Sequence, residues 1–145
     1  MIKNEKQYKI TKSKVALLQQ GIARIKSEEK PLRVKSRLIV NSMLDMRASM
    51  EDQMAHYDSL KENKTIILKS RRLQDLPAMI IEYKIALGLT QKEMAKKIGM
   101  KEQQLQRYED TDFESISFTN LLRILERVGL EVVIADTPVG KKVKF

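Results

Sequence analysis

The feature that most constrains the fold of this chain is the segment of residues 91–108, where small and apolar residues recur at the spacing that two short crossing helices need. Ala95 is small enough to let a second helix approach closely. Gly99 can adopt the left-handed backbone conformation that ends a helix at little steric cost. The expected inward or turn positions are Met94, Ala95, Ile98, Gly99, Met100, Leu105 and Tyr108. This pattern predicts two short helices joined by a tight turn.

The ends of these two helices can also be predicted. Thr90 followed by Glu93 is the pattern of a capping box, in which the hydroxyl and the carboxylate each accept a hydrogen bond from a backbone N–H, so the first helix should begin at Gln91. The second helix is expected at about residues 101–109. Its exposed N-terminal half would carry Lys101, Glu102, Gln103, Gln106 and Arg107. Such side chains can pair with base edges or phosphates. A single polar residue is more often simply solvated, but the whole arrangement favours DNA recognition.

Residues 89–109, with Lys84 and Gly88 before them, resemble the phage-repressor or XRE type of helix-turn-helix. The first helix of that unit opens with Leu-Thr-Gln, here Leu89-Thr90-Gln91, and the second closes with an apolar residue followed by x-Arg-x-Glu, here Leu105-Gln106-Arg107-Tyr108-Glu109. The resemblance covers about residues 76–130. It implies a bundle of about five helices and insertion of the second helix into the major groove.

The same resemblance implies roles for individual residues. Gln91 would contact a phosphate at the N-terminus of the first helix, where free amide N–H groups attract anions. Lys84 would form an ion pair with Glu109, although lysine in place of the usual arginine loses a bidentate geometry and should weaken the pair. The residues expected to contact DNA are Thr90, Gln91, Lys92, Lys101, Glu102, Gln103, Gln104, Gln106 and Arg107.

One segment departs from the family pattern. Many members follow the second helix with an Asn-Gly-Lys/Arg loop that binds phosphates, whereas residues 110–114 of this chain read Asp-Thr-Asp-Phe-Glu. Three carboxylates repel a phosphate backbone, so we expect DNA binding by a single copy to be modest. Either this loop turns away from the duplex or phosphate binding comes from elsewhere in the protein.

Composition limits the remaining possibilities. A chain of 145 residues can form one domain, or a small module with an appendage of similar size. The absence of cysteine excludes disulfides and thiolate chemistry. His56, the only histidine, is expected to be a packing or surface residue. The formal net charge of +9 favours attraction to nucleic acid. No run of about 18 apolar residues and no signal peptide is present, so we expect a cytoplasmic, nucleoid-associated protein of bacterial type.

The first 62 residues have helical patterns of a different kind. Val15, Leu18, Ile22 and Ile25 recur at spacings of three and four, which predicts a helix over about residues 11–27 after a polar lead of residues 1–9. A longer helix is expected from residue 32 or 34 to 62. Its apolar stripe would comprise Ile39, Met43, Met46, Met50, Tyr57 and Leu60, and it would be widened by Leu38, Val40, Leu44 and Met54. At 1.5 Å per residue this helix would be about 40 Å long and would need a partner along its length.

The methionines of this helix allow two interpretations. Met43, Met46, Met50 and Met54 can fill an ordinary core between two antiparallel helices, or they can form an adaptable docking surface for a partner. Homodimerisation is compatible with both. Two linked DNA-binding heads on two half-sites would also gain from a raised effective concentration. We therefore expect a homodimer that is coupled by the N-terminal hairpin.

Residues 63–75 are expected to connect the hairpin to the DNA-binding domain. Residues 65–68 and 130–135 have the composition of short strands. Pro77 fits the first turn of a helix over residues 78–87, and Ser117 fits the N-cap of a closing helix. The stripe expected to be buried on that helix is Phe118, Leu121, Leu122, Leu125 and Val128.

The predicted fold is therefore mainly all-α. It comprises a helical hairpin over residues 1–62, the connector, a helix-turn-helix domain over residues 76–136 and a basic tail over residues 137–145, with one or two short strands allowed.

Two classes of function remain open. The first is a sequence-specific transcriptional regulator, most simply a repressor, with operator DNA as its partner. The N-terminal helical extension also resembles antitoxins of the HigA type, which bind their own operator and neutralise an mRNA-cleaving toxin protein. The alternative is a protein-interaction adaptor whose helix-turn-helix no longer binds DNA, for which the acidic loop argues. We expect no enzymatic activity, no cofactor and no metal site, because no metal-ligand cluster, phosphate-binding glycine loop or catalytic pair is recognisable.

Overall fold

A computed structural model describes residues 1–62 and 73–130 of the chain. These residues are almost entirely helical and contain no β-strand, which confirms the all-α class. The elements are α1 (Glu5–Glu28), α2 (Val34–Glu62), a short 3-10 helix η1 (Leu73–Asp75), α3 (Leu76–Ala86), α4 (Gln91–Ile98), α5 (Glu102–Asp110) and α6 (Phe118–Val128). Within the described residues, no helix is long and apolar enough to cross a membrane.

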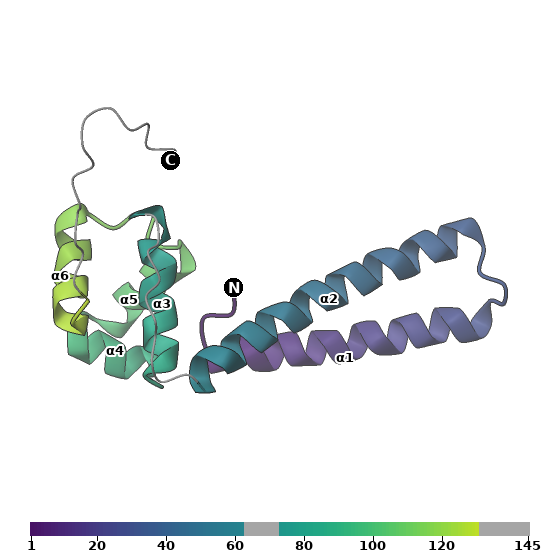
Figure 1. Ribbon diagram of the computed structural model, residues 1–145, viewed down its shortest axis with the longest axis horizontal. Helices are drawn as coiled ribbons and strands as arrows, with labels where there is room; N and C mark the ends of the chain where they lie inside the picture. The colour runs from purple at the N-terminus through teal and green to yellow at the C-terminus, as the bar shows by residue number, and fades with distance from the viewer. Residues whose placement is uncertain (63–72, 131–145) are drawn as a thin grey trace, which may run out of the picture.

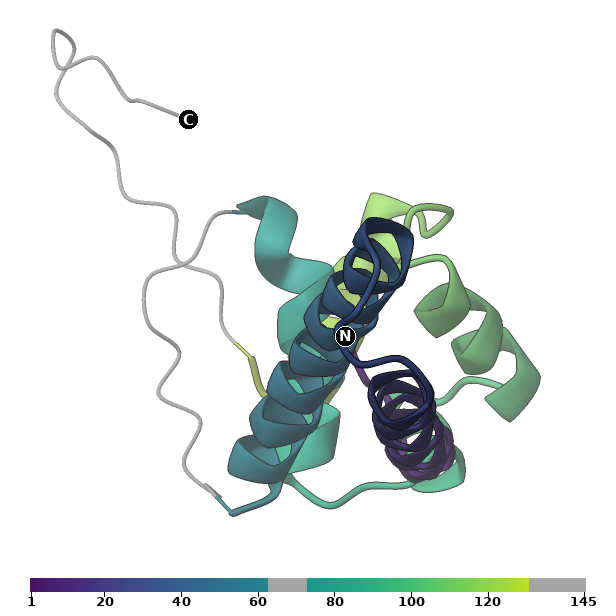
Figure 2. The same ribbon diagram turned by 90° about the vertical axis from the view of Figure 1, so that its right-hand side faces the viewer.

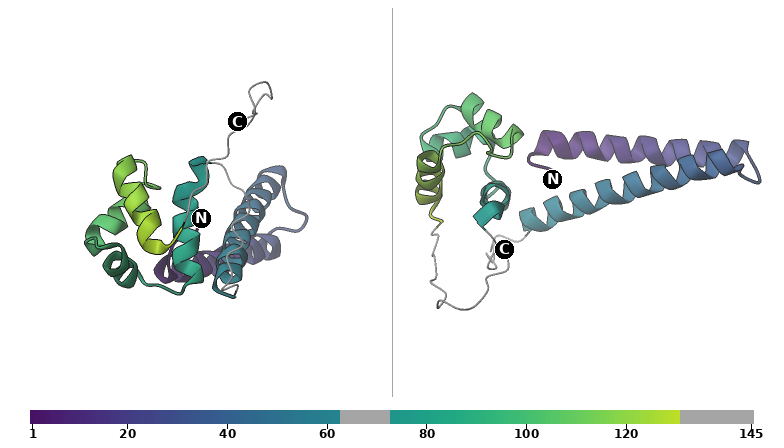
Figure 3. Two further views of the ribbon diagram at one scale, coloured as in Figure 1. Left: turned by 60° about the vertical axis from the view of Figure 1, so that its left-hand side comes forward. Right: turned by 90° about the horizontal axis from the view of Figure 1, so that it is seen from above.

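The first two helices form an antiparallel hairpin that projects from a head made of the other helices (Figures 1 and 3). α1 begins at residue 5 rather than near residue 11, so most of the expected polar lead is helical. The cause is Asn4, whose side chain accepts a hydrogen bond from the backbone N–H of Gln7 at 2.9 Å and so caps the helix. The expected start of α2 near residue 34 and its end at residue 62 are confirmed.

The residues through which the two hairpin helices contact each other are spaced alternately three and four apart along each helix. Ile22 of α1 and Val40 of α2 are buried in this seam. Ile39 and Met46, which we expected to be buried, are 53% and 50% exposed. The expected stripe is wrong at these two positions because the seam runs through residues 40, 43, 47, 50, 54 and 57, and Ile39 and Met46 lie on its flank.

The base of the hairpin is built into the core of the head. Ile2 and Tyr57 are both buried, and they belong to one apolar cluster with Ile80 of α3 and Leu105 of α5. The N-terminus accordingly lies at the junction of hairpin and head (Figure 1). Burial of a side chain such as Ile2 is worth about 1.5–3 kcal/mol. The first residues of the chain therefore help to hold the hairpin against the head.

Tyr57 makes this junction sensitive to high pH. Burial, followed by the nearby Glu5 carboxylate that accepts its hydroxyl hydrogen bond at 3.4 Å, raises the pKa of Tyr57 from 10.0 to about 12. A raised folded-state pKa contributes stability below pH 10 that is lost as the pH rises toward 12. We expect the free energy of unfolding to fall less steeply over this range in Tyr57→Phe than in the wild type. Parallel slopes in urea unfolding at pH 9.5 to 12 would contradict this assignment.

In the head, α3 to α6 and the end of α2 surround the core. The most completely buried side chains are Ile80, Ile81, Met94, Leu105 and Ile124. Figure 2 views the molecule along the hairpin, with the head behind it.

α3 begins two residues earlier than expected, with Pro77 in its first turn. The hydroxyl of Tyr83 on α3 donates to the backbone carbonyl of Val128 on α6 at 2.7 Å and ties the two helices together.

The closing helix α6 has the expected ends but a different buried face. Ser117 accepts a hydrogen bond from the backbone N–H of Asn120, and Gly129 ends the helix with a φ of +79°. Phe118 and Leu122, which we expected to be buried, are 65% and 47% exposed, whereas Ile124 is buried. At 100° per residue the core-facing direction lies between residues 124 and 125, so residues 118 and 122 lie on its flank.

Several expectations fall outside the described residues. The strand expected at residues 65–68 and most of the strand expected at residues 130–135 lie there, as do most of the connector and the whole basic tail. Leu130 itself is described and is not in a strand.

Candidate nucleic-acid interface

Helices α4 and α5 pack against each other around the expected small and apolar residues. The capping box is formed, since Thr90 Oγ1 accepts from the backbone N–H of Glu93 while a Glu93 carboxylate oxygen accepts from the backbone N–H of Thr90. The Glu93 carboxylate accepts hydrogen bonds from the backbone N–H and from the hydroxyl of Thr90, and these two bonds, the backbone one first, lower the pKa of Glu93. Met94, Ala95, Ile98 and Leu105 are buried as expected.

The turn between α4 and α5 favours glycine because of its backbone conformation. Gly99 has a φ of +68°, in the left-handed region that side chains with a Cβ rarely adopt. A Cβ at this position would lie 2.7 Å from Nη1 of Arg127, but that atom ends a flexible, exposed side chain that can move aside. The positive φ is therefore the reason for glycine at position 99.

The outward side of α5 carries exposed polar side chains. We define the outer face of α5 as Lys101, Glu102, Gln103, Gln106 and Arg107, all of which are exposed. Lys101 precedes the helix at its N-cap, and Gln103 and Arg107 point directly away from the buried Leu105 and Glu109. These five residues of the predicted DNA-contacting set are thus brought together on one surface.

Gln104 is also exposed, and helical periodicity places it about 60° from Arg107 and about 100° from Gln103. Its Nε2 donates to the hydroxyl of Tyr108 at 3.3 Å. Gln104 therefore lies at the edge of the outer face of α5, with its amide engaged by Tyr108.

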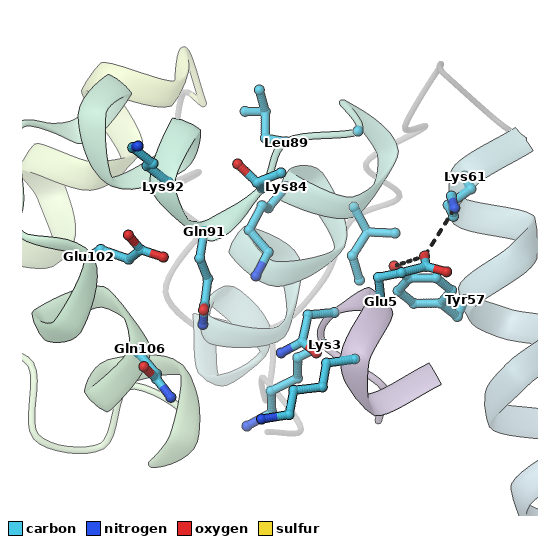
Figure 4. A pocket seen from close by; sticks show the side chains of 15 residues that line it. Lys3, Glu5, Tyr57, Lys61, Lys84, Leu89, Gln91, Lys92, Glu102 and Gln106 are labelled. Carbon is cyan, nitrogen blue, oxygen red and sulfur yellow. Dashed lines mark hydrogen bonds and ion pairs between the residues drawn. The ribbon is translucent and has the colours of Figure 1, made fainter. Parts of the chain in front are cut away.

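The first turn of α4 lies beside the outer face of α5. Thr90 and Lys92 are exposed, but Gln91 is half-buried and its Nε2 donates to Oε2 of Glu109 at 3.1 Å. The side chain of Gln91 thus points inward (Figure 4). In the described part of the chain, the backbone N–H groups of Gln91 and Lys92 donate no hydrogen bond. A phosphate contact at this helix end would therefore use backbone N–H groups.

Lys84 and Glu109 form an ion pair in the interior of the head. Both side chains are 3% exposed, and Lys84 Nζ lies 2.6 Å from Oε1 and 2.7 Å from Oε2 of Glu109. The two parallel N–H bonds that arginine would donate are replaced by one ammonium that lies between the two oxygens. With the additional bond from Gln91, one carboxylate joins α3, α4 and α5. This cluster fixes the orientation of α5 relative to the rest of the head.

The acidic loop after α5 is anchored at Phe113 and contacts the hairpin. Asp112 and Phe113 have φ values of +48° and +61°, an uncommon conformation that is compensated by burial of the Phe113 ring against Tyr108. Lys3 Nζ lies 2.9 Å from Oδ1 of Asp112 and also donates to the backbone carbonyl of Glu109. A lysine of the hairpin thus compensates one of the three loop carboxylates, a contact that no local pattern in the sequence indicates.

Other titratable groups of the head form contacts of a structural kind. His56 Nε2 lies 3.3 Å from Oε1 of Glu82, which is buried on α3. Among the described residues, no three His, Asp or Glu side chains come together in a way that could hold a metal ion.

Comparisons with known proteins agree with this geometry. A family model described as a helix-turn-helix domain matches residues 50–135, which is more than half of the chain. The match begins within α2, whose end contributes Tyr57 to the core of the head. Searches among curated proteins and among solved structures give no match.

Proposed function

Because the chain belongs to this helix-turn-helix domain family, we propose that it is a sequence-specific DNA-binding transcriptional regulator that inserts α5 into the major groove. The observation that carries the proposal is the outer face of α5, which combines amide, carboxylate and cationic side chains that can pair with base edges. The Lys84–Glu109 pair holds this helix rigidly with that face outward. A regulator of this kind acts in the cytoplasm, on the nucleoid.

The simplest mode of action is repression of the XRE or phage-repressor type, in which the bound protein covers a promoter. Leu89-Thr90-Gln91 at the start of α4 and the Lys84–Glu109 pair support this assignment. In this scheme the domain of residues 76–136 binds DNA, residues 63–75 connect it to the hairpin, and residues 137–145 form a basic tail.

We further propose that the protein acts as a homodimer that is coupled by the hairpin of residues 1–62. The support is a set of large apolar side chains that the hairpin exposes: Ile10, Leu17, Val34, Leu38, Ile39 and Met46. Large apolar side chains that are exposed along one hairpin are candidates for contact with a second protein. A second copy would cover it and bring two heads to two half-sites, which raises the effective concentration of the second head.

The same exposed surface also supports a second candidate, an autoregulatory antitoxin that binds a toxin protein through the hairpin. Co-purification with a small RNase-like protein from its own operon would select this candidate. An adaptor without DNA binding remains the alternative from another class, and the exposed carboxylates of Asp110 and Glu114 favour it.

The proposal is tested by titrating fluorescent DNA from upstream of the protein's own coding region. The expected result is saturable binding that is at least about 1,000-fold tighter than binding to a scrambled duplex of the same composition, which is the usual margin for specific regulators. Equal affinity for the two duplexes would contradict sequence-specific recognition, and no binding to either would support the adaptor.

A further inference from the structure

A hollow of about 480 Å³ separates the helix-turn-helix from the hairpin. One wall is formed by Thr90, Gln91 and Lys92 of the first turn of α4 and by Glu102 and Gln106 of α5. The opposite wall is the hairpin base, which we define as residues 2–6 and 57–61. Figure 4 shows both walls with Lys84 between them. One wall of the hollow is therefore made of residues that are proposed to contact DNA.

The chemistry of the hollow fits a charged, extended ligand. Pockets for small molecules are mostly lined by apolar and aromatic side chains. Here most lining side chains are charged or carry amides, and the hollow is open to solvent. Gln91 and Lys92, whose backbone N–H groups donate no hydrogen bond, are among the lining residues. These features fit the sugar-phosphate backbone of DNA better than a compact apolar effector.

The hairpin base supplies cations to this hollow. Lys6 is exposed and, within residues 1–62 and 73–130, forms no ion pair. Lys61 is 49% exposed and pairs at 3.2 Å with Glu5, which is 52% exposed. A solvent-exposed pair of this kind contributes little stability, so Lys61 can exchange its partner for a phosphate. Lys3 already forms an ion pair with Asp112, which reduces the repulsion between that carboxylate and a nearby phosphate.

We propose that Lys6 and Lys61 of the hairpin base bind backbone phosphates of the DNA strand that crosses the first turn of α4. The inference rests on the proposed DNA-binding function and adds a second phosphate-binding element to it. This element takes the place of the basic loop that related helix-turn-helix proteins carry after the recognition helix, where this chain has carboxylates. The hairpin then contributes to DNA affinity directly, as well as through any coupling of two copies.

The test compares two double variants with the same change in net charge. Lys6→Gln/Lys61→Gln alters the hairpin base, and Lys26→Gln/Lys35→Gln alters exposed lysines near the far end of the hairpin. Because phosphate contacts carry no sequence information, a mixed-sequence duplex serves as the probe. We expect the slope of log Kobs against log salt to become shallower by about 0.9 for each lost contact, about 1.8 in all, only in the hairpin-base variant.

Three outcomes would overturn the inference. If the hairpin-base variant binds with the wild-type slope, Lys6 and Lys61 make no phosphate contacts. If the slope falls equally in both double variants, the effect comes from net charge alone. If the wild-type protein binds no duplex, the proposed function fails as well, whereas in the first two cases it stands. Thermal unfolding of both variants, whose substitutions lie on exposed side chains, checks that the fold is unchanged.

Discussion

Replacement of Lys84 by methionine is expected to lower the free energy of unfolding by about 3–5 kcal/mol, because it leaves the Glu109 carboxylate buried without its cation. Both side chains are 3% exposed, so water cannot take the place of the lost ammonium. Gln91 donates a single hydrogen bond to Glu109 and cannot neutralise its charge. The loss should appear as a lower urea midpoint with an unchanged m-value.

The double variant Lys84→Met/Glu109→Met separates the cost of an unpaired charge from the value of the pair. It should recover most of the stability, since replacing both members of a buried pair by apolar residues is often close to neutral. Lys96→Met is the matched control, because Lys96 is an exposed lysine on α4 and its loss should change stability by less than about 0.5 kcal/mol. If Lys84→Met were as stable as this control, the pair would not hold α5 in place.

Replacement of Arg107 or Gln103 by alanine is expected to weaken binding to the specific DNA site by about 1–3 kcal/mol, or about fivefold to 150-fold. Both residues point directly away from the core of the head and are exposed, so their loss should leave stability almost unchanged. Binding to a scrambled duplex should change much less than specific binding, because base contacts determine specificity. The affinity ratio between the two duplexes is the quantity to measure.

Gln104→Ala is the matched control on the same helix. Its amide already donates to Tyr108 at the edge of the outer face of α5, so the specificity ratio should fall much less than in Arg107→Ala or Gln103→Ala. A reversed order, with Gln104→Ala damaging specific binding while Arg107→Ala does not, would mean that α5 presents a different side to DNA.

The helix-turn-helix could be predicted in detail because its determinants are local. Thr90 and Glu93 fix the start of α4, Gly99 fixes its end, and Ser117 and Gly129 fix the ends of α6. Each of these signals acts within three or four residues of itself. Their effect on the backbone is therefore largely independent of the rest of the chain.

The errors concern features that depend on packing between distant segments. Which flank of an amphipathic helix becomes buried depends on its neighbours, so Ile39 and Phe118 are exposed although each lies in an apolar pattern. The start of α1 is an exception, because it depends on the local cap at Asn4 rather than on packing with a distant segment. The contact of Lys3 with Asp112 arises only when the hairpin base docks on the head, and sequence spacing cannot indicate it.

The central claim is that the outer face of α5 enters the major groove of operator DNA. Dimethyl sulfate methylates guanine N7 in that groove, where arginine and lysine make their commonest specific contact. On DNA from upstream of its own coding region, the wild-type protein should protect guanines within one bounded site, and the Gln103→Ala/Arg107→Ala variant should lose that protection at equal occupancy. Protection that is unchanged in the variant, or absent in the wild type, would contradict the claim.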